Sequence, residues 1–149
     1  MKKLFILALI TLFSSISPPD AKAQAGRLQI GILADVTDQR ILLDIQAHPT
    51  IRYFITNSVM VSASGLYDHS GTYDRKYLNF AGRLYPFRKK SLYGQVGEET
   101  NFDGGNLFNT QVGYTSNFGW FWVEPYVNGR FGDYSTNVQI GIGAGISLN

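Results

Sequence analysis

NVQIGIGAGISLN, residues 137–149, closes the chain with an almost perfect alternation of side chains. Every second position from Val138 to Leu148 is apolar, and the positions between them are Gln, Gly or Ser. Because successive side chains of a β-strand point to opposite faces, the alternation predicts a strand with one apolar face and one small, polar face. About 9–11 residues of tilted strand cross a bilayer, so this segment is long enough to do so.

Seven earlier segments show the same kind of alternation and are separated by turns and polar loops. The eight predicted strands cover residues 27–36, 41–53, 58–67, 75–87, 91–99, 106–115, 120–131 and 137–149. Tight connections, one of them at Ser116–Gly119, alternate with longer, Gly-rich loops, as the turns and outer loops of outer-membrane barrels do. After residue 26 no capped segment has helical periodicity. The chain is therefore predicted to be all-β, an eight-stranded antiparallel up-and-down transmembrane β-barrel.

The N-terminus has the three parts of a secretory signal peptide. Lys2 and Lys3 are positively charged, Leu4–Ile16 is mainly apolar, and Ala21–Ala23 forms an A-x-A cleavage site. The apolar run is shorter than the roughly 20 residues that a spanning helix needs. We expect residues 1–23 to be a cleaved signal peptide and residues 24–149 to be the outer-membrane β-barrel domain.

The charge of the mature chain excludes one class of partner. Residues 24–149 contain ten Lys and Arg and ten Asp and Glu, so the domain is neutral. A nucleic-acid-binding surface would need a basic stripe.

The chain has no Cys, which excludes a disulfide framework and cysteine metal sites. We expect no cofactor and no metal site.

Charged residues fall on the predicted inward face of the strands. They are Asp35, Asp44, Arg52, Arg83, Glu99, Glu124 and Arg130. Eight strands enclose an interior that side chains just fill, and buried charges are costly unless they are paired. We expect these residues to form an interior network of salt bridges and hydrogen bonds that plugs the barrel. The alternative is a narrow polar conduit for water or small ions.

The topology divides the aromatic residues between the two ends of the barrel. The group at the periplasmic end is predicted to be Tyr53, Phe54, Tyr85, Phe87, Tyr93, Tyr114, Phe118, Trp120, Phe121 and Trp122. The group at the outer end is predicted to be Tyr67, Tyr73, Tyr77, Phe102, Phe131 and Tyr134. Such groups are typical of two membrane–water interfaces, although aromatic residues are also common in strands generally.

Several short stretches carry a family resemblance. Pro49–Asn57 (PTIRYFITN) resembles a P-x-x-x-Y-F-x-T-D/N turn motif, and Arg83–Phe87 (RLYPF) resembles an R-Y-Y-x-F strand end. Val123–Tyr126 and the C-terminal glycines also fit. With these features the chain resembles the small OmpX/OmpA-like outer-membrane β-barrel proteins of Bacteroidota-type bacteria. That family often ends in an aromatic residue that the barrel-assembly machinery recognises, whereas this chain ends in Asn149.

The expected protein is a monomer in the bacterial outer membrane. Its expected partners are outer-membrane lipids and lipopolysaccharide, and the barrel-assembly machinery during biogenesis. The expected function is structural, adhesive or surface-interacting, through the outer loops, without enzymatic activity. One alternative is a secreted, soluble, lipocalin-like barrel that binds a small apolar ligand. Another is an enzyme that modifies lipid A, but the consecutive loop residues Asp68, His69 and Ser70 are poorly placed for a catalytic relay.

Overall fold

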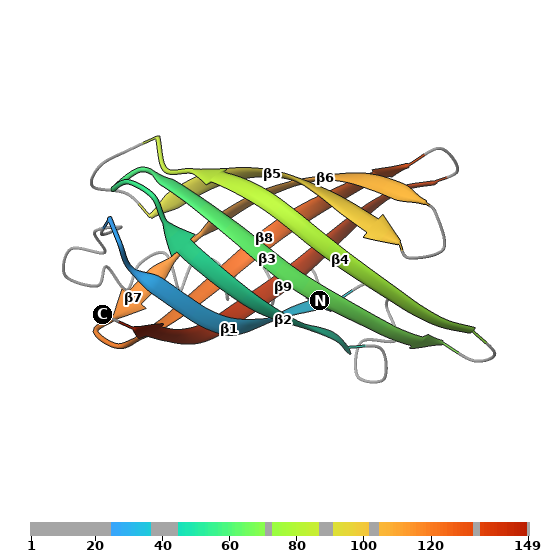
Figure 1. The fold of residues 1–149 in the computed structure, drawn as a ribbon, viewed down its shortest axis with the longest axis horizontal. Helices are drawn as coiled ribbons and strands as arrows, with labels where there is room; N and C mark the ends of the chain where they lie inside the picture. The colour runs from blue at the N-terminus through green and yellow to red at the C-terminus, as the bar shows by residue number, and fades with distance from the viewer. Residues whose placement is uncertain are drawn as a thin grey trace, which may run out of the picture.

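A computed structural model describes residues 25–36, 45–70, 73–86, 91–101, 105–132 and 135–148. Every regular element in these ranges is a β-strand (Figure 1). The strands are β1 (Leu28–Val36), β2 (Ile45–Phe54), β3 (Val59–Ser70), β4 (Tyr73–Leu84), β5 (Leu92–Asn101), β6 (Asn106–Tyr114), β7 (Ser116–Phe118), β8 (Phe121–Gly132) and β9 (Ser135–Leu148). The described residues contain no helix that is long and apolar enough to cross a membrane.

The strands pair antiparallel and close into a barrel. Their order is β6–β5–β4–β3–β2–β1–β9–β8–β7, and β6 also pairs with β8, which joins the two edges of the sheet. Strands that follow one another in the sequence lie beside each other, except for β6 and β7, which both pair with β8 (Figure 1). We call the end that holds Leu28 and Leu148 the terminal end and the other end the loop end.

A proline divides one of the eight barrel strands into β6 and β7. β6 pairs with β8 up to Gly113–Tyr126, and β7 resumes the same register at Ser116–Val123. In that register Tyr114 faces Pro125, which has no N–H to donate to the ladder. β6 and β7 are therefore one barrel strand with an interrupted ladder, and the predicted eight-stranded antiparallel barrel is confirmed.

Some predicted boundaries need correction. The turn predicted at Ser116–Gly119 is wrong, because Ser116–Phe118 pairs with β8 and the chain reverses at Gly119, whose φ is +71°. A positive φ suits glycine, which has no Cβ. The predicted signal peptide and the first four residues of the strand predicted at 41–53, including Asp44, lie outside the described residues.

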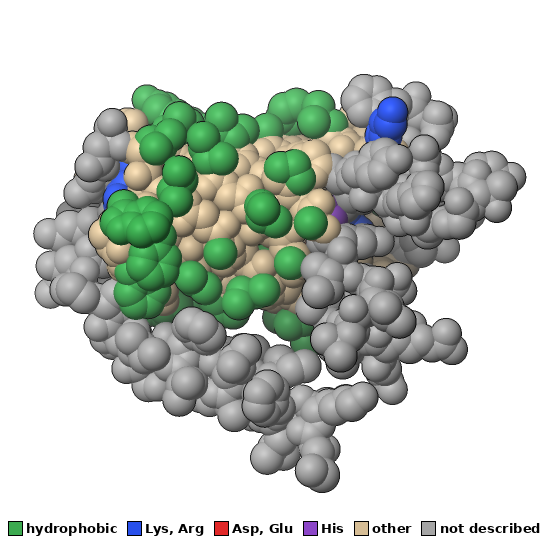
Figure 2. Space-filling view, turned by 90° about the horizontal axis from the view of Figure 1, so that it is seen from below, with side chains coloured by type: hydrophobic (Ala, Val, Ile, Leu, Met, Phe, Trp, Pro, Cys, Tyr) green, Lys and Arg blue, Asp and Glu red, His purple; other side chains and the backbone are tan. Residues whose placement is uncertain are grey.

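The outer wall of the barrel is apolar. Its most exposed apolar side chains come from every strand of the barrel and include Ile32, Ile51, Val61, Phe80, Val96, Val112, Val127 and Val138. Figure 2 shows hydrophobic side chains over the visible wall, with Lys and Arg only toward its ends. The buried polar side chains occupy the alternate positions of the same strands. The barrel is thus apolar outside and polar inside.

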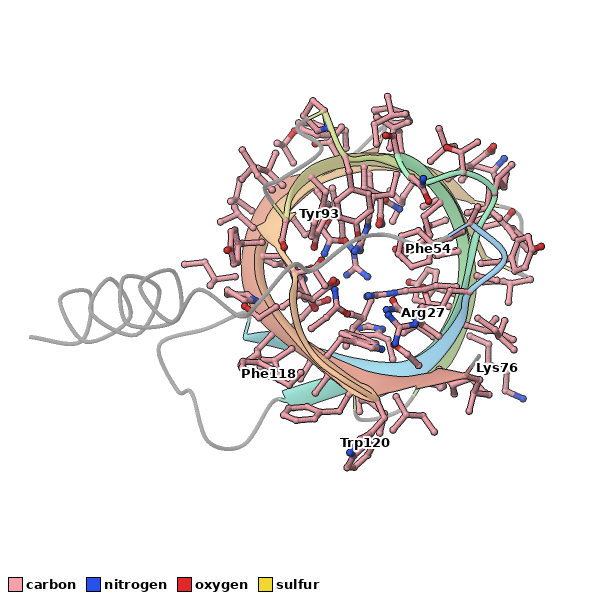
Figure 3. All side chains as sticks on the ribbon, turned by 90° about the vertical axis from the view of Figure 1, so that its left-hand side faces the viewer. Arg27, Phe54, Lys76, Tyr93, Phe118 and Trp120 are labelled. Atoms are coloured by element: carbon pink, nitrogen blue, oxygen red, sulfur yellow. The ribbon has the colours of Figure 1, made fainter. Side chains whose placement is uncertain are left out.

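The predicted aromatic group at the terminal end is partly wrong. Phe54, Tyr85, Tyr93 and Trp122 are at most 8% exposed and pack inside the barrel. They share the parity of inward residues: Trp122, for example, lies two positions before the buried Glu124. Figure 3, viewed from the terminal end, shows Phe54 within the ring of strands and Trp120 outside it. Of the outer group, Phe131 is exposed, whereas the side chains of Tyr67, Tyr73, Phe102 and Tyr134 lie outside the described part of the chain.

The glycines of β9 make room for large side chains inside the barrel. A Cβ at Gly141 would collide with the ring of Tyr126, and one at Gly143 would lie 2.7 Å from Leu33 Cδ2. At Gly145 it would collide with the carbonyl oxygen of Ile30 and lie 2.6 Å from Trp122. The small inward face of the C-terminal strand is thus the wall against which the interior aromatic residues pack.

We predict that Gly145→Ala destabilises the barrel, because backbone and indole atoms occupy the space of the new methyl group. Overpacking of this kind costs about 1–3 kcal/mol. Gly94→Ala is the matched control, since no atom lies within 4 Å of its Cβ position. Urea unfolding of the refolded barrel in micelles measures both. Equal midpoints for the two variants would contradict the packing argument.

Candidate functional site in the polar interior

Glu124 of β8 lies at the centre of the interior polar network. Arg52 donates to it in bidentate fashion, from Nη1 to Oε2 at 2.9 Å and from Nη2 to Oε1 at 2.6 Å. Arg83 does the same from β4, at 2.7 and 3.0 Å. Tyr93 and Thr115 donate two further hydrogen bonds to the carboxylate, at 3.2 and 3.1 Å. The Glu124 carboxylate is completely buried, and both arginines are 1% exposed.

Aromatic rings hold the two guanidinium groups in place. The Arg52 guanidinium lies 4.0 Å from the centroid of Trp122, and that of Arg83 lies 3.6 Å from the centroid of Tyr93. Each arginine therefore contacts the face of a ring while it donates to the carboxylate. Cation–π contacts of this kind are strongest when water is excluded, and the bidentate geometry fixes the orientation of each pair.

A circuit of hydrogen bonds surrounds the central carboxylate. Arg83 Nε donates to Gln95 Oε1 at 2.8 Å, and Gln95 Nε2 donates to Gln111 Oε1 at 3.1 Å. Gln111 Nε2 then donates to the hydroxyl of Tyr93 at 2.8 Å, which in turn donates to Glu124. Each of these bonds is donated in the direction from Arg83 toward Glu124, which also accepts directly from Arg83, so donors and acceptors match and the chain of bonds holds these side chains across the lumen.

A second charged layer lies nearer the loop end. Asp35 Oδ1 accepts a hydrogen bond of 2.6 Å from Tyr126, and its Oδ2 lies 3.0 Å from His48 Nε2. Arg130 pairs with Glu99 at 3.0 Å. With its amide nitrogen turned toward Asp35, Gln139 joins the two pairs, because it donates to Asp35 at 3.2 Å and accepts from Arg130 at 3.3 Å. Such an amide orientation is assigned from its hydrogen-bond partners.

A small polar cavity lies within this second layer. Its volume is about 30 Å³, which is room for a water molecule or two. The residues around it are Leu33, Asp35, His48, Ser64, Asn79, Glu99, Asn109, Gln111, Tyr126, Asn128 and Arg130. The terminal half of the interior is therefore densely filled by the arginine layer and its aromatic rings, and the loop half retains space for water.

The structure brings six of the seven predicted interior residues into two groups. Arg52, Arg83 and Glu124 form one ion-paired cluster. Asp35, Glu99 and Arg130 belong to the other. Asp44 lies outside the described residues. The pairing joins residues 41 and 72 positions apart in the sequence, so spacing alone gave no indication of which acid meets which base.

Sequence reasoning missed several uncharged members of the network. Tyr93 was placed with the rim aromatics, and no role was expected for Thr115 or Gln139, yet all three contact buried charges. The period-2 alternation was the available signal, because Tyr93 shares the parity of the inward Glu99, Thr115 that of Gln111, and Gln139 that of Ser147.

Histidine and carboxylate side chains are the candidates for catalysis or metal binding in this chain. Among the described residues no group of three or more His, Asp or Glu side chains could hold a metal ion. His48 contacts Asp35, as a catalytic histidine would contact its carboxylate, but both are buried. The side chains of Asp68, His69 and Ser70 lie outside the described part of the chain.

Solved structures with a similar fold are known. One is the N-terminal β-barrel domain of Pseudomonas aeruginosa OprF, with a TM-score of 0.67, 14% sequence identity, and coverage of 83% of this chain and 98% of that chain. The chain shares the fold of that domain. Ail, the attachment invasion locus protein of Yersinia pestis, gives a TM-score of 0.45 with 16% identity over 84% of this chain and 100% of that chain. No protein-family model and no curated protein matches the sequence.

The similarity to the OprF domain, at 14% identity, establishes the fold and nothing finer. The expected resemblance to small OmpX/OmpA-like barrels is confirmed at the level of the fold. The Bacteroidota-type assignment remains a prediction from the sequence motifs.

We predict that Glu124→Gln strongly destabilises the barrel, because it leaves two buried arginines without a counter-charge. Removing one partner of a buried ion pair costs about 3–5 kcal/mol. Glu98→Gln is the control, since Glu98 is exposed and accepts a single hydrogen bond, from Asn106. Urea midpoints of the refolded variants provide the comparison. A midpoint for Glu124→Gln as high as that of the control would show that the central pairs contribute little.

Proposed function

We propose that this protein is a small barrel of the bacterial outer membrane, plugged by its polar interior and acting at the cell surface through its loops. The observation that carries this proposal is the reversed polarity of the barrel. Aliphatic side chains from all eight barrel strands face outward, and the charged side chains of Asp35, Arg52, Arg83, Glu99 and Glu124 are buried inside. A barrel in water would gain nothing from an apolar wall, whereas lipid solvates such a wall.

The filled interior supports a plugged barrel over the alternatives. The ion-paired layer around Glu124 occupies the lumen between β2, β4 and β8, and the cavity beyond it is about 30 Å³. That space is far below the roughly 300 Å³ of a typical ligand pocket, and its lining is polar. The same observations weigh against a lipocalin-like carrier of an apolar ligand and against an open ion conduit.

The proposed partners are those that the outer wall and the loops would meet. Outer-membrane lipids would solvate the apolar wall, lipopolysaccharide would contact the loop end, and the barrel-assembly machinery would insert the chain. A closed sheet favours a monomer, because closure leaves little edge for pairing with another copy. We propose no enzymatic activity and no nucleic-acid partner. A role in adhesion or surface interaction remains the proposal for the loops.

We predict that the full-length chain, expressed in a Gram-negative host, is recovered in the outer-membrane fraction. On SDS gels, unheated samples should run as a folded band that shifts on heating, because a closed barrel resists SDS until it is heated. Recovery as a soluble periplasmic protein would overturn the proposed location.

A pair of variants makes that test specific to lipid. Val112→Arg puts a charge on a wall position that is 57% exposed, and an arginine near the midplane of a bilayer costs about 2–4 kcal/mol. The folded band should therefore decrease, whereas an exposed arginine on a soluble barrel would be tolerated. Gly105→Arg, in the exposed approach to β6, is the control and should leave the folded band unchanged.

The plug is tested separately in planar lipid bilayers. We predict that the purified barrel gives no stable, stepwise openings, because the buried ion pairs of Arg52 and Arg83 with Glu124 lie across the lumen. Regular single-channel steps from the pure protein would contradict the plug while leaving the membrane location intact.

A further inference from the structure

An outward-facing carboxylate lies within the apolar wall, on β5. Glu98 is exposed, whereas its neighbours in the strand, Gly97 and Glu99, are buried. Because side chains alternate between the faces of a strand, the Glu98 side chain points out of the barrel. Two positions before it, Val96 is 55% exposed on the same face. Glu98 is therefore separate from the interior charges, and its surroundings are those of the wall.

Aromatic side chains flank this carboxylate. The register places Glu98 between Phe80 of β4 and Phe108 of β6, and it places Phe108 opposite Phe131 of β8. The three phenylalanines are 57%, 51% and 42% exposed, in that order. Residues directly opposite each other in an antiparallel pair have Cβ atoms about 5 Å apart. The carboxylate thus has an exposed phenylalanine on each side.

A groove in the wall lies along this row. Its volume is about 540 Å³, within the roughly 300–1,000 Å³ of ordinary ligand pockets. The ring of Phe131 leans over Gly129, since a Cβ at Gly129 would lie 3.1 Å from two carbons of that ring. The ring therefore forms a side of the groove and does not fill it. We call this feature the acidic groove, and the side chains that line it are those of Val96, Glu98, Asn106, Leu107, Phe108 and Phe131.

The acidic groove has a polar end and an apolar end. Toward the loop end of the barrel, Asn106 Nδ2 donates to Glu98 Oε1 at 2.9 Å, and Thr100 Oγ1 donates to Asn106 Oδ1 at 2.6 Å. Toward the terminal end, Val96 of β5 and Val112 of β6 face outward and are more than half exposed. Glu98 therefore lies at the margin where the apolar wall gives way to polar side chains.

The Glu98 carboxylate has no cationic partner among the described residues. The ion pairs found there join other acids to arginine or histidine, and Asn106 supplies the hydrogen bond to Glu98. A carboxylate beside hydrocarbon is costly when no positive charge compensates it. A cation from outside the protein would lower this cost, and phenyl rings beside it would add cation–π attraction.

The surroundings of the groove restrict what can occupy it. Lipid is the medium that this wall meets, if the barrel lies in the membrane as proposed. An acyl chain matches the apolar end of the groove. At the polar end, the charge of Glu98 attracts an ammonium headgroup and repels the headgroup of an anionic lipid.

We propose that the acidic groove binds a phospholipid with an ammonium headgroup, of the phosphatidylethanolamine class. The ammonium group contacts the carboxylate of Glu98 between Phe80 and Phe108, and one acyl chain lies in the groove along Val96 and Phe108. The phosphate lies beyond the margin, in water. This inference rests on the proposed membrane location and adds a specific lipid partner to it.

Native mass spectrometry of the refolded barrel, released from nonionic micelles, counts the lipids that it retains. Phosphatidylethanolamine and phosphatidylglycerol with identical acyl chains are supplied at equal concentrations. The barrel should retain the first over the second by roughly tenfold, the effect of one hydrogen bond to a charged group. Equal retention would overturn the proposal. Retention of lipid A as strong as that of phosphatidylethanolamine would also overturn it, because the lipid A headgroup is anionic.

Variants of Glu98 test the role of its charge. Glu98→Gln keeps the size of the side chain and should abolish the preference between the two lipids. The barrel should stay folded, since Glu98 is exposed. Glu98→Asp is the matched control, because it keeps the charge and should keep most of the preference. A preference that survives Glu98→Gln would show that the headgroup is recognised elsewhere, and would overturn the site.

A second pair of variants tests the groove itself. Val96→Trp fills the groove and should reduce retention of phosphatidylethanolamine. Val127→Trp, at a wall position of β8 that is 44% exposed and outside the groove, is the control and should leave retention unchanged. Equal retention by the two variants would place the lipid elsewhere on the wall and overturn the site.

These outcomes are distinguishable from failure of the proposed location. A barrel that is recovered in the outer membrane but shows no lipid preference would lose the acidic groove as a site and keep its location. A protein recovered as a soluble periplasmic chain would lose both.

Discussion

The buried carboxylate of Glu124, shared by two arginines, is the constraint around which the interior is built. A carboxylate in a closed barrel must be compensated by charge and hydrogen bonds, and this one accepts bonds from Arg52, Arg83, Tyr93 and Thr115. The guanidinium groups of the two arginines also pack against the rings of Trp122 and Tyr93, and Arg83 donates to the amide of Gln95. These contacts fix the positions of the surrounding side chains. Because these donors come from strands on different sides of the lumen, the cluster also connects the walls of the barrel.

The apolar wall and the polar lumen are two consequences of one alternating pattern. Each strand contributes aliphatic residues to the wall and polar ones to the interior, so neither could exist without the other. The prolines modify this regular arrangement locally. Pro125 interrupts the ladder where the filled, terminal half of the lumen lies against β8, whereas Pro49 interrupts it beside the small polar cavity. The same chemical defect thus has different surroundings in the two places.

Much of the fold followed from period-2 alternation, because inward and outward positions can be counted along a strand without knowing its neighbours. The same count placed Arg52, Arg83 and Glu124 inside. The count also gives aromatic residues such as Phe54 and Trp122 an inward position, but the expectation of an interfacial group outweighed it. It also could not show that Ser116–Phe118 continues a strand past Pro125, because that depends on the register with β8.

The sequence by itself determined the fold class, the polarity of each face and the set of charges enclosed, since these depend only on local alternation. Only the tertiary structure decided which charges meet. Pairing of Arg52 and Arg83 with Glu124, and of Tyr126 and His48 with Asp35, depends on the stagger of strands distant in sequence. The same holds for the glycines of β9. Only the tertiary structure explains why these residues are small, because it places Tyr126 and Trp122 against them.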